Sequence, residues 1–376
     1  MNFRTIIAAV CLSAIATLVS AEIIPFYIAT RISATSPSQG IYRSTLDTAT
    51  RRLSDPVLAT KAVRTDFIAI HPNGDYLYTV NRSSDQPEGA VTAYAIDKST
   101  GNLKLINEQT SGGSGPNHLS IDLSGRFVLL NNYSSGSIQS VPIQSNGSLG
   151  KPAGFVQHEG SSVNPQRQAG PHAHCIYASP DNRRVYVTDL GLDKTLIYQF
   201  DSTKGTFTPN NPPFAQSKPG VGPRHFTFHT SGRFLYVLNE IEGSVTGYTV
   251  NASNGSLTEI QTISLFPEGY TGATSSAEIF VTPNGRFLYG SNRGNSTIAC
   301  FQVDQNTGRL TFVEHESASI AYPGNFAIDP TGAFLIVANR NGNSISCYGI
   351  NQETGALDIA GPISLVPSPS CVMFAR

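Results

Sequence analysis

The sequence contains no tryptophan and no basic or acidic block, and its charged residues are sparse and balanced. Of its 376 residues 14% are charged, and the formal net charge is −1. Without a basic block the chain is not expected to bind nucleic acid or an anionic membrane through bulk electrostatics. The lack of tryptophan excludes propellers built on Trp-Asp repeats. A hydrophobic content of 39% still allows a large core, so the composition is typical of a globular protein.

Cysteine is scarce, and the motifs of several enzyme classes are missing. Cys11 lies in the N-terminal apolar run, and no Cys-x-x-Cys occurs. Cys175, Cys300, Cys347 and Cys371 each stand in a strand-like apolar run, which favours buried free thiols over disulfides or a zinc site. There is no Gly-x-Ser-x-Gly elbow, dinucleotide fingerprint or P-loop. We therefore expect no serine nucleophile and no cofactor.

The N-terminus has the pattern of a secretory signal. Arg4 precedes an apolar run from Ile6 to Val19, and the small residues Ser20 and Ala21 follow. The run is too short to span a bilayer comfortably, so we predict a signal peptide over residues 1–21 rather than an uncleaved anchor. The mature domain, residues 22–376, is then expected to be secreted and to have no membrane contact. Six glycosylation sequons are compatible with a secreted glycoprotein; they begin at Asn81, Asn132, Asn146, Asn251, Asn254 and Asn295.

A unit of about fifty residues occurs six times. Each copy is an alternating strand, a tight turn and a second strand, and the copies begin at Phe67, His118, Cys175, His225, Glu278 and Asn325. The turn residues recur with the same period, at Gly74, Gly125, Asn182, Gly232, Gly285 and Gly332. A strand-only repeat of this length predicts a β-propeller of four-stranded blades. The C-terminal CVMFA and the N-terminal FYIATRIS would together complete a seventh blade, closing an all-β ring.

The start of strand one and the end of strand two should meet on one face of the ring, because the two strands are antiparallel neighbours. The strand-one starts are Asp66-Phe67, Asn117-His118, His174-Cys175, Arg224-His225, Ala277-Glu278 and Gly324-Asn325. The strand-two ends are Asn81-Arg82, Asn132-Tyr133, Asp189-Leu190, Asn239-Glu240, Asn292-Arg293 and Asn339-Arg340. We interpret the recurring Asn or Asp as structural, a short side chain that satisfies backbone groups where the strand ends.

The variable positions predict a cationic pocket that also contains bases. The strand-two ends carry three arginines and a glutamate, namely Arg82, Arg293, Arg340 and Glu240. They face three histidines and a second glutamate at the strand-one starts, namely His118, His174, His225 and Glu278. The alternative is that each arginine only pairs with a neighbouring carboxylate. The pocket would bind a small anion through its arginines and move a proton through a histidine or glutamate.

The segment from Val163 to Asp193 adds Arg167 and a His-x-His pair to this face. His172 and His174 are two residues apart on a strand start, so they should point to the same side. Such a pair could bind a metal together with Asp189 or Glu240. Nearby arginines would repel a cation, so we expect no metal and assign the histidines to base catalysis or substrate hydrogen bonding.

Several runs resemble the lactonase family of seven-bladed propellers. They are NPQRQAGPHAH, VTDLGLD, GPRH followed by LNE, SAEIFVTPNGRFLYGSNR and NFAIDPTGAFLIVAN, and the resemblance covers nearly the whole mature chain. The family includes propeller-type 6-phosphogluconolactonases and a fungal carboxy-cis,cis-muconate cyclase. The resemblance implies a lactone as substrate or product, without a cofactor. One departure is Gly324, where the family pattern often has an arginine before Asn-Phe.

Carried onto the matching motifs, the proposed catalytic set of the cyclase branch is His172 or His174, Arg224, Glu240 and Arg293. We predict that the substrate is bound by further ring positions, namely His118, Arg167, His225, Glu278, Asn325 and Arg340.

Three functions remain open from the sequence. The first is hydrolysis of a sugar lactone, with arginines stabilising the oxyanion and a histidine or Glu240 activating water. The second is cyclisation of a muconate-type dicarboxylate, an intramolecular lyase step that needs the same arginines and an acid. The third is a secreted propeller that binds a ligand at the same mouth without chemistry. In each case the expected partner is a small anion or sugar lactone.

Overall fold

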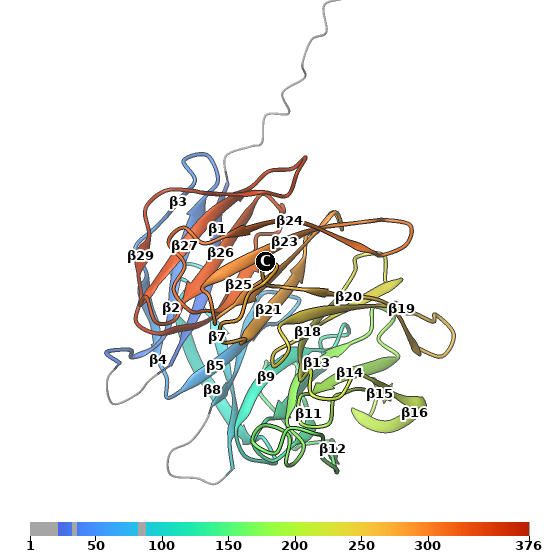
Figure 1. Ribbon diagram of the computed structural model, residues 1–376. Coiled ribbons are helices and arrows are strands. Elements are labelled where there is room, and N and C mark those ends of the chain that lie inside the picture. The colour runs from blue at the N-terminus through green and yellow to red at the C-terminus, as the bar shows by residue number, and fades with distance from the viewer. Residues whose placement is uncertain (1–21, 32–35, 82–87, 376) are drawn as a thin grey trace, which may run out of the picture.

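The computed structural model describes residues 22–31, 36–81 and 88–375, and these form a ring of seven β-sheets (Figure 1). The predicted signal peptide, residues 1–21, lies outside the described residues, so cleavage and secretion stay predictions. The fold confirms the all-β seven-bladed propeller that the repeat predicts.

Six blades are formed by consecutive stretches of chain, each with its strands in sequence order from the axis outward. The first three are β5(Thr65–Ile70), β6(Tyr76–Asn81), β7(Ala90–Ile96) and β8(Leu103–Thr110); β9(Pro116–Ile121), β10(Phe127–Asn132), β11(Ser137–Pro142) and β12(Gly154–Gln157); and β13(Ala173–Ala178), β14(Arg184–Asp189), β15(Lys194–Asp201) and β16(Thr206–Gln216). The next three are β17(Pro223–Phe228), β18(Phe234–Asn239), β19(Ser244–Val250) and β20(Leu257–Ser264); β21(Ser276–Val281), β22(Phe287–Asn292), β23(Thr297–Val303) and β24(Leu310–Glu316); and β25(Pro323–Ile328), β26(Phe334–Asn339) and β27(Ser344–Ile350), with β28(Leu357–Ile359) and β29(Ser364–Leu365) both paired to β27.

The seventh blade joins the two ends of the chain. The C-terminal β30(Pro369–Phe374) is its innermost strand and pairs antiparallel with β1(Ile23–Thr30). Outward from β1 lie β2(Gly40–Asp47) and then the short β3(Arg52–Leu53) and β4(Val57–Lys61). Figure 1 shows the blue N-terminal strands beside the red C-terminal ones. The two ends of the chain are therefore held in one sheet, which closes the ring.

The predicted hairpin turns join the first two strands of each continuous blade. Five of the six turn positions are glycines, such as Gly74 with φ 73° and Gly285 with φ 75°. The sixth is Asn182, with φ 58°. All six lie in the left-handed region, which glycine and asparagine adopt at least cost.

Tyrosine hydroxyls tie neighbouring blades together. Tyr236 on β18 donates to the Gly308 carbonyl of the next blade at 2.8 Å, and Tyr27, Tyr78, Tyr186 and Tyr289 make the equivalent bond to Gly101, Gly147, Gly255 and Gly355. In the second blade Leu129 replaces the tyrosine, and Ser140 donates to Gly205 instead. A buried phenol needs an acceptor, so each tie also satisfies the tyrosine itself.

The hydrophobic core lies between consecutive blades. One cluster joins Phe234, Tyr236 and Leu238 of β18 to Ile279, Leu288 and Phe301 of the following blade. A second joins the closing blade, through Phe26, Ile28 and Phe374, to Ile336 and Cys347 of the blade before it. Cys175, Cys300, Cys347 and Cys371 are buried and free, which confirms the expectation from the sequence.

Every blade has a β-bulge at the start of its innermost strand. In β13, for example, Ala173 pairs with Asp189 and Cys175 with Thr188, so His174 is an extra residue. By position, the extra residues of the seven blades are Asp66, Asn117, His174, Arg224, Ala277, Gly324 and Ser370. In β17 and β21 the following residue, His225 or Glu278, is also outside the ladder. A bulge re-aims the side chain of its extra residue, and all seven lie at the same end of the ring.

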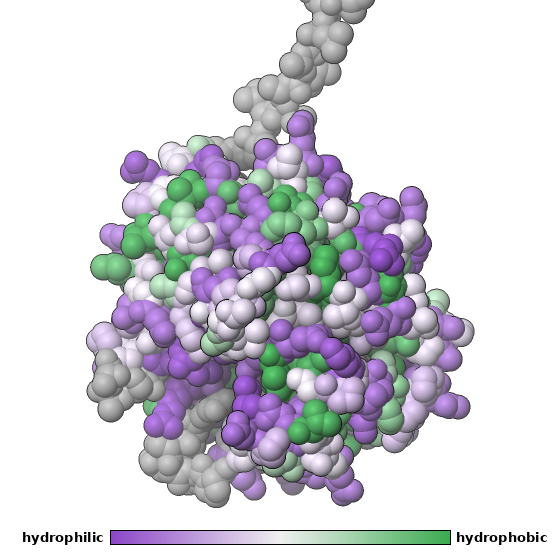
Figure 2. Space-filling view, in the orientation of Figure 1, coloured by the Kyte–Doolittle hydropathy of each residue, from purple (hydrophilic) through white to green (hydrophobic). Residues whose placement is uncertain are grey.

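The outer surface is mostly polar. Figure 2 shows hydrophilic side chains over most of one face, with apolar side chains in small separate groups. Within residues 22–31, 36–81 and 88–375 there is no helix of the length and apolarity needed to cross a membrane. One predicted sequon is inaccessible, because Asn132 is fully buried and its amide donates to Ser111 and Ser137. Asn132 therefore cannot carry a glycan in this fold.

Candidate active site

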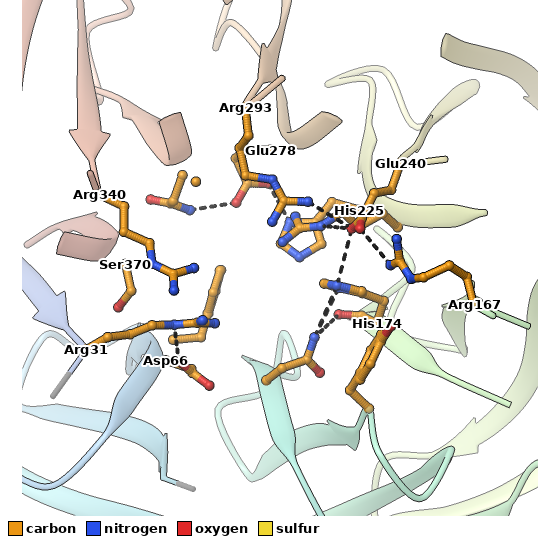
Figure 3. Close-up of a pocket in the computed structure, with 16 residues that line it drawn as sticks. Arg31, Asp66, Arg167, His174, His225, Glu240, Glu278, Arg293, Arg340 and Ser370 are labelled. Atoms are coloured by element: carbon orange, nitrogen blue, oxygen red, sulfur yellow. Dashed lines mark hydrogen bonds and ion pairs between the residues drawn. The ribbon is translucent and has the colours of Figure 1, made fainter. Parts of the chain in front are cut away.

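A cavity of about 200 Å³ lies where the bulged strand starts and the strand-two ends meet (Figure 3). Its lining comes from all seven blades and consists of Arg31, Asp66, Phe67, Asn117, Tyr133, Arg167, His174, Arg224, His225, Glu240, Glu278, Arg293, Gly324, Asn325, Arg340 and Ser370. Six of the seven extra bulge residues are among them; the exception is Ala277, whose carbonyl accepts a hydrogen bond from Arg224 Nη1 at 2.6 Å. The bulges thus turn one residue per blade toward a common space.

Glu240 is the centre of one wall of the cavity. It directly follows β18, and its carboxylate is within 2.8 Å of Arg167 Nη2 and Arg224 Nε and within 3.1 Å of Arg293 Nη2. Burial alone would raise the pKa of Glu240, but the charges of the three arginines outweigh it and lower the pKa to about 2. Glu240 is therefore a fixed anion at neutral pH and a weak base.

His174 lies beside this cluster, with Nε2 4.0 Å from Glu240 Oε2. A chain of amides contacts the imidazole ring of His174. Asn131 Nδ2 donates both to the Ala173 carbonyl and to Asn117 Oδ1, and Asn117 presents its Nδ2 to the ring, 3.0 Å from Nδ1 and 3.5 Å from Nε2. Burial, followed by the nearby Arg224, lowers the pKa of His174 well below its usual value. His174 is thus a neutral imidazole at neutral pH.

Glu278 and His225 form a second pair in the cavity lining. Glu278 Oε1 accepts hydrogen bonds from His225 Nδ1 at 2.8 Å and from the Ile279 amide at 3.0 Å, while Oε2 accepts one from Asn325 Nδ2 at 2.6 Å. Burial raises the pKa of Glu278 to about 7, although Arg224 acts in the opposite direction. Burial, followed by the charge of Arg224, lowers the pKa of His225 well below its usual value. Within the described chain His225 Nε2 has no hydrogen-bond partner.

The lining carries an excess of positive charge. It includes five arginines and three carboxylates, and one of the carboxylates is Glu278, whose raised pKa keeps it partly protonated near neutral pH. Guanidinium groups are well suited to bind carboxylate or phosphate. The arrangement therefore suits a small anion, with a neutral histidine on each of two neighbouring blades.

Nine of the eleven residues that the sequence singled out line this cavity; they are Arg167, His174, Arg224, His225, Glu240, Glu278, Arg293, Asn325 and Arg340. His172 and His118 do not. His172 precedes β13 and stacks on Tyr133, with its Nδ1 2.9 Å from the Tyr133 carbonyl. His118 is fully buried behind the lining, between Phe67 and Tyr177. Arg82, also noted in the sequence, lies outside the described residues.

Asp189 has the structural role predicted for its position. One carboxylate oxygen accepts hydrogen bonds from the backbone amides of His172, Gly191 and Leu192, and the other is 2.7 Å from His158 Nδ1. The asparagines at the equivalent positions are also engaged within their blades, as Asn292 Nδ2 is with the Leu265 carbonyl. Among the described residues no group of three or more histidines, cysteines or carboxylates could hold a metal ion.

Sequence reasoning missed Arg31 and Ser370, which both come from the closing blade. The signal was present but divided between the two ends of the chain. Thr30 ends β1, the second strand of that blade, and Arg31 follows it, just as Asn339 ends β26 and Arg340 follows it. Ser370 is the extra residue of the β30 bulge and corresponds to Arg224 and Gly324.

The ring and its cavity define a seven-bladed propeller with an arginine-rich small-molecule site at one mouth. Residues 25–374 match the family model described as "Lactonase, 7-bladed beta-propeller". The chain belongs to this family.

Its similar proteins include bacterial 6-phosphogluconolactonases. The enzyme of that name from Bacillus subtilis is 38% identical over 293 residues, which are 78% of this chain and 82% of the relative. The one from Formosa agariphila is 34% identical over 273 residues, 71% of this chain and 76% of the relative. The solved structure of the periplasmic gluconolactonase of Pseudomonas aeruginosa superposes with a TM-score of 0.88 at 28% identity, covering 94% of this chain and 99% of that one. The chain is thus a 6-phosphogluconolactonase-like propeller.

Proposed function

We propose that the protein hydrolyses the ring ester of a sugar lactone of the 6-phosphogluconolactone type. The observation that carries the proposal is the Glu240 cluster, in which one buried carboxylate holds Arg167, Arg224 and Arg293 around a cavity that also contains neutral histidines. The names of the similar proteins agree with this function.

The arginines would stabilise the charge that develops during ring opening. Attack of water on the lactone carbonyl produces a tetrahedral intermediate with a negative oxygen, which preorganised donors stabilise. Glu240 and the backbone fix Arg224 and Arg293, yet Nη2 of Arg224 and Nη1 of Arg293 bond to nothing else in the described chain. These two groups are free to donate to the carbonyl oxygen.

The His225–Glu278 pair is the best placed base. Glu278 Oε1 accepts a hydrogen bond from the protonated Nδ1 of His225, which leaves Nε2 with a free electron pair. In this scheme Nε2 takes a proton from the attacking water and returns it to the ring oxygen as the C–O bond breaks. His174, a neutral imidazole beside Glu240, forms a hydrogen bond with the substrate. Glu240, with its pKa near 2, holds the arginines rather than taking up the proton.

The test is the rate of ring opening of δ-gluconolactone and its 6-phosphate, measured against buffer. Glu240→Gln should lower kcat/KM at least about 100-fold, because the arginines lose the charge that positions them. The matched control is Glu242→Gln, since Glu242 pairs with Lys218 at the surface, outside the cavity. The proposal fails if the wild type is no faster than buffer, or if Glu240→Gln retains full activity.

The same panel separates the other two functions. Loss of the ultraviolet absorbance of the conjugated diene on adding carboxymuconate would identify a cyclase instead. A rise in melting temperature with sugar acids, but no turnover of any substrate, would identify a binding protein.

A further inference from the structure

The wall of the cavity opposite Glu240 carries two more arginines. Arg31 follows β1 in the closing blade, and Arg340 follows β26 in the preceding blade. Figure 3 shows both guanidinium groups directed into the cavity from the side opposite Arg167 and Glu240. The cationic residues of the site are therefore divided between two walls.

The arginines on the two walls differ in their partners. Arg167, Arg224 and Arg293 all share Glu240. Arg31 Nε is 2.5 Å from Asp66, whereas the guanidinium of Arg340 has neither a hydrogen bond nor an ion pair with any described residue. The guanidinium of Arg340 instead makes a cation–π contact with the face of the Tyr322 ring, at 5.7 Å from the ring centre to the guanidinium carbon.

Arg31 and Arg340 are close enough to repel each other. Burial, followed by the charge of Arg31, lowers the pKa of Arg340. Half-buried like charges are costly unless a counter-charge compensates them. Asp66, which pairs with Arg31, compensates one of the two positive charges, and an anion between the guanidiniums would compensate the other.

Beside Arg340 the lining leaves room for such a group. Gly324 is the extra residue of the β25 bulge, the position at which other blades carry Asp66, Asn117, His174 or Arg224. A Cβ atom built on Gly324 would have no neighbour within 4 Å, and its φ is not one that requires glycine. The backbone would therefore accept a larger residue, and the space is open to a ligand.

We propose that Arg31 and Arg340 form an anion subsite for a phosphate or carboxylate that the substrate carries outside its lactone ring. The proposal rests on the proposed function for the position of the ring, which would lie against Arg224, Arg293 and the histidines. It adds that the protein selects lactones with an anionic substituent, and that Arg340 is the main residue of this selection.

The test compares substrates that differ only in this substituent. Arg340→Ala should lower kcat/KM for 6-phosphogluconolactone about 10- to 100-fold, the effect of losing a charge-assisted contact, and leave the value for unphosphorylated gluconolactone within about twofold. Arg31→Ala should act in the same direction. A lactone that carries a carboxylate, such as glucarolactone, shows which anion is preferred.

Two further variants make the result specific. Gly324→Leu fills the space beside Arg340 without altering the arginines, and should reproduce the selective loss. Arg309→Ala removes an exposed arginine outside the cavity and should change neither substrate. Equal losses on both substrates in Arg340→Ala, or no loss on either, would overturn the subsite.

A failure of the lactonase proposal can be distinguished from a failure of the anion subsite. If the wild type opens neither lactone, titration calorimetry with inorganic phosphate and with 6-phosphogluconate decides the question. Binding to the wild type that is at least tenfold weaker in Arg340→Ala supports the subsite without the enzyme. Equal binding, or none to the wild type, overturns it.

Discussion

Glu240 and Glu278 line the same cavity, yet their pKa values move in opposite directions. Both are buried, which by itself favours the neutral acid. Glu240 contacts three guanidiniums and stays ionised, whereas Glu278 bonds to a neutral histidine, an amide side chain and one backbone amide. One glutamate is thus suited to hold charges in place and the other to take part in proton transfer.

The raised pKa of Glu278 predicts a pH dependence of stability. Between about pH 4.5 and pH 7 the unfolded chain has lost this proton while the folded protein keeps it, so the folded state loses stability as pH rises. The free energy of unfolding of the wild type, relative to Glu278→Gln, should fall by about 1.4 kcal/mol per pH unit in this window. Urea unfolding of both proteins from pH 4 to 8 measures the difference. A difference that is flat or increases with pH would contradict the prediction.

Most residues that line the cavity could be predicted, because the repeat register assigns each position either to the mouth of the ring or to the outer part of a blade. The roles of the individual side chains could not be predicted. Alternation alone would place His172 and His174 together, but β13 begins between them and its bulge turns His174 inward. The position of the His174 ring depends on contacts with Asn117 and Asn131, which are far from it in the sequence.

At the scale of the element, the tyrosine ties explain why the second strand so often carries a tyrosine at its centre. Tyr236→Phe would leave the buried Gly308 carbonyl without its side-chain donor while keeping the ring packing. We expect the free energy of unfolding to fall by about 1 kcal/mol.

Urea unfolding measures this effect, with Tyr270→Phe as the control. The Tyr270 hydroxyl donates to the Ala273 carbonyl at the surface, so its loss should cost less than about 0.5 kcal/mol. Equal losses of unfolding free energy in the two variants would show that the inter-blade hydrogen bond stabilises the fold no more than the surface one.

For the whole molecule, the closing blade makes the two ends of the chain interdependent. Phe374 of β30 is buried against Phe26 of β1, with ring centres 5.6 Å apart. Phe374→Ala should destabilise the entire ring by about 3 to 5 kcal/mol and keep a single unfolding transition, because every blade packs on its neighbours.

Calorimetry and circular dichroism during heating test this cooperativity. Phe312→Ala, at a half-exposed phenylalanine of the outer strand β24, is the control and should shift the transition much less. A separate early transition in Phe374→Ala would show that the closing blade unfolds on its own.

The number of blades and their closure could be predicted from the sequence because six copies of one unit leave two complementary fragments at the ends. Arg31 was missed for the same reason, since the seventh copy is divided between the termini and no continuous segment displays it. Its role depends on Arg340, more than three hundred residues away in the sequence.

The bulges allow the residues that line the cavity to be replaced without changing how the strands pair. Each extra residue stands outside the ladder of paired residues, and six of the seven line the cavity, so replacing one of these six alters the cavity without removing a strand-pairing partner. These positions can therefore carry different residues while the paired strands around them stay the same. Substrate preference can therefore be redesigned by exchanging these residues one blade at a time, while the strand pairing of each blade stays the same.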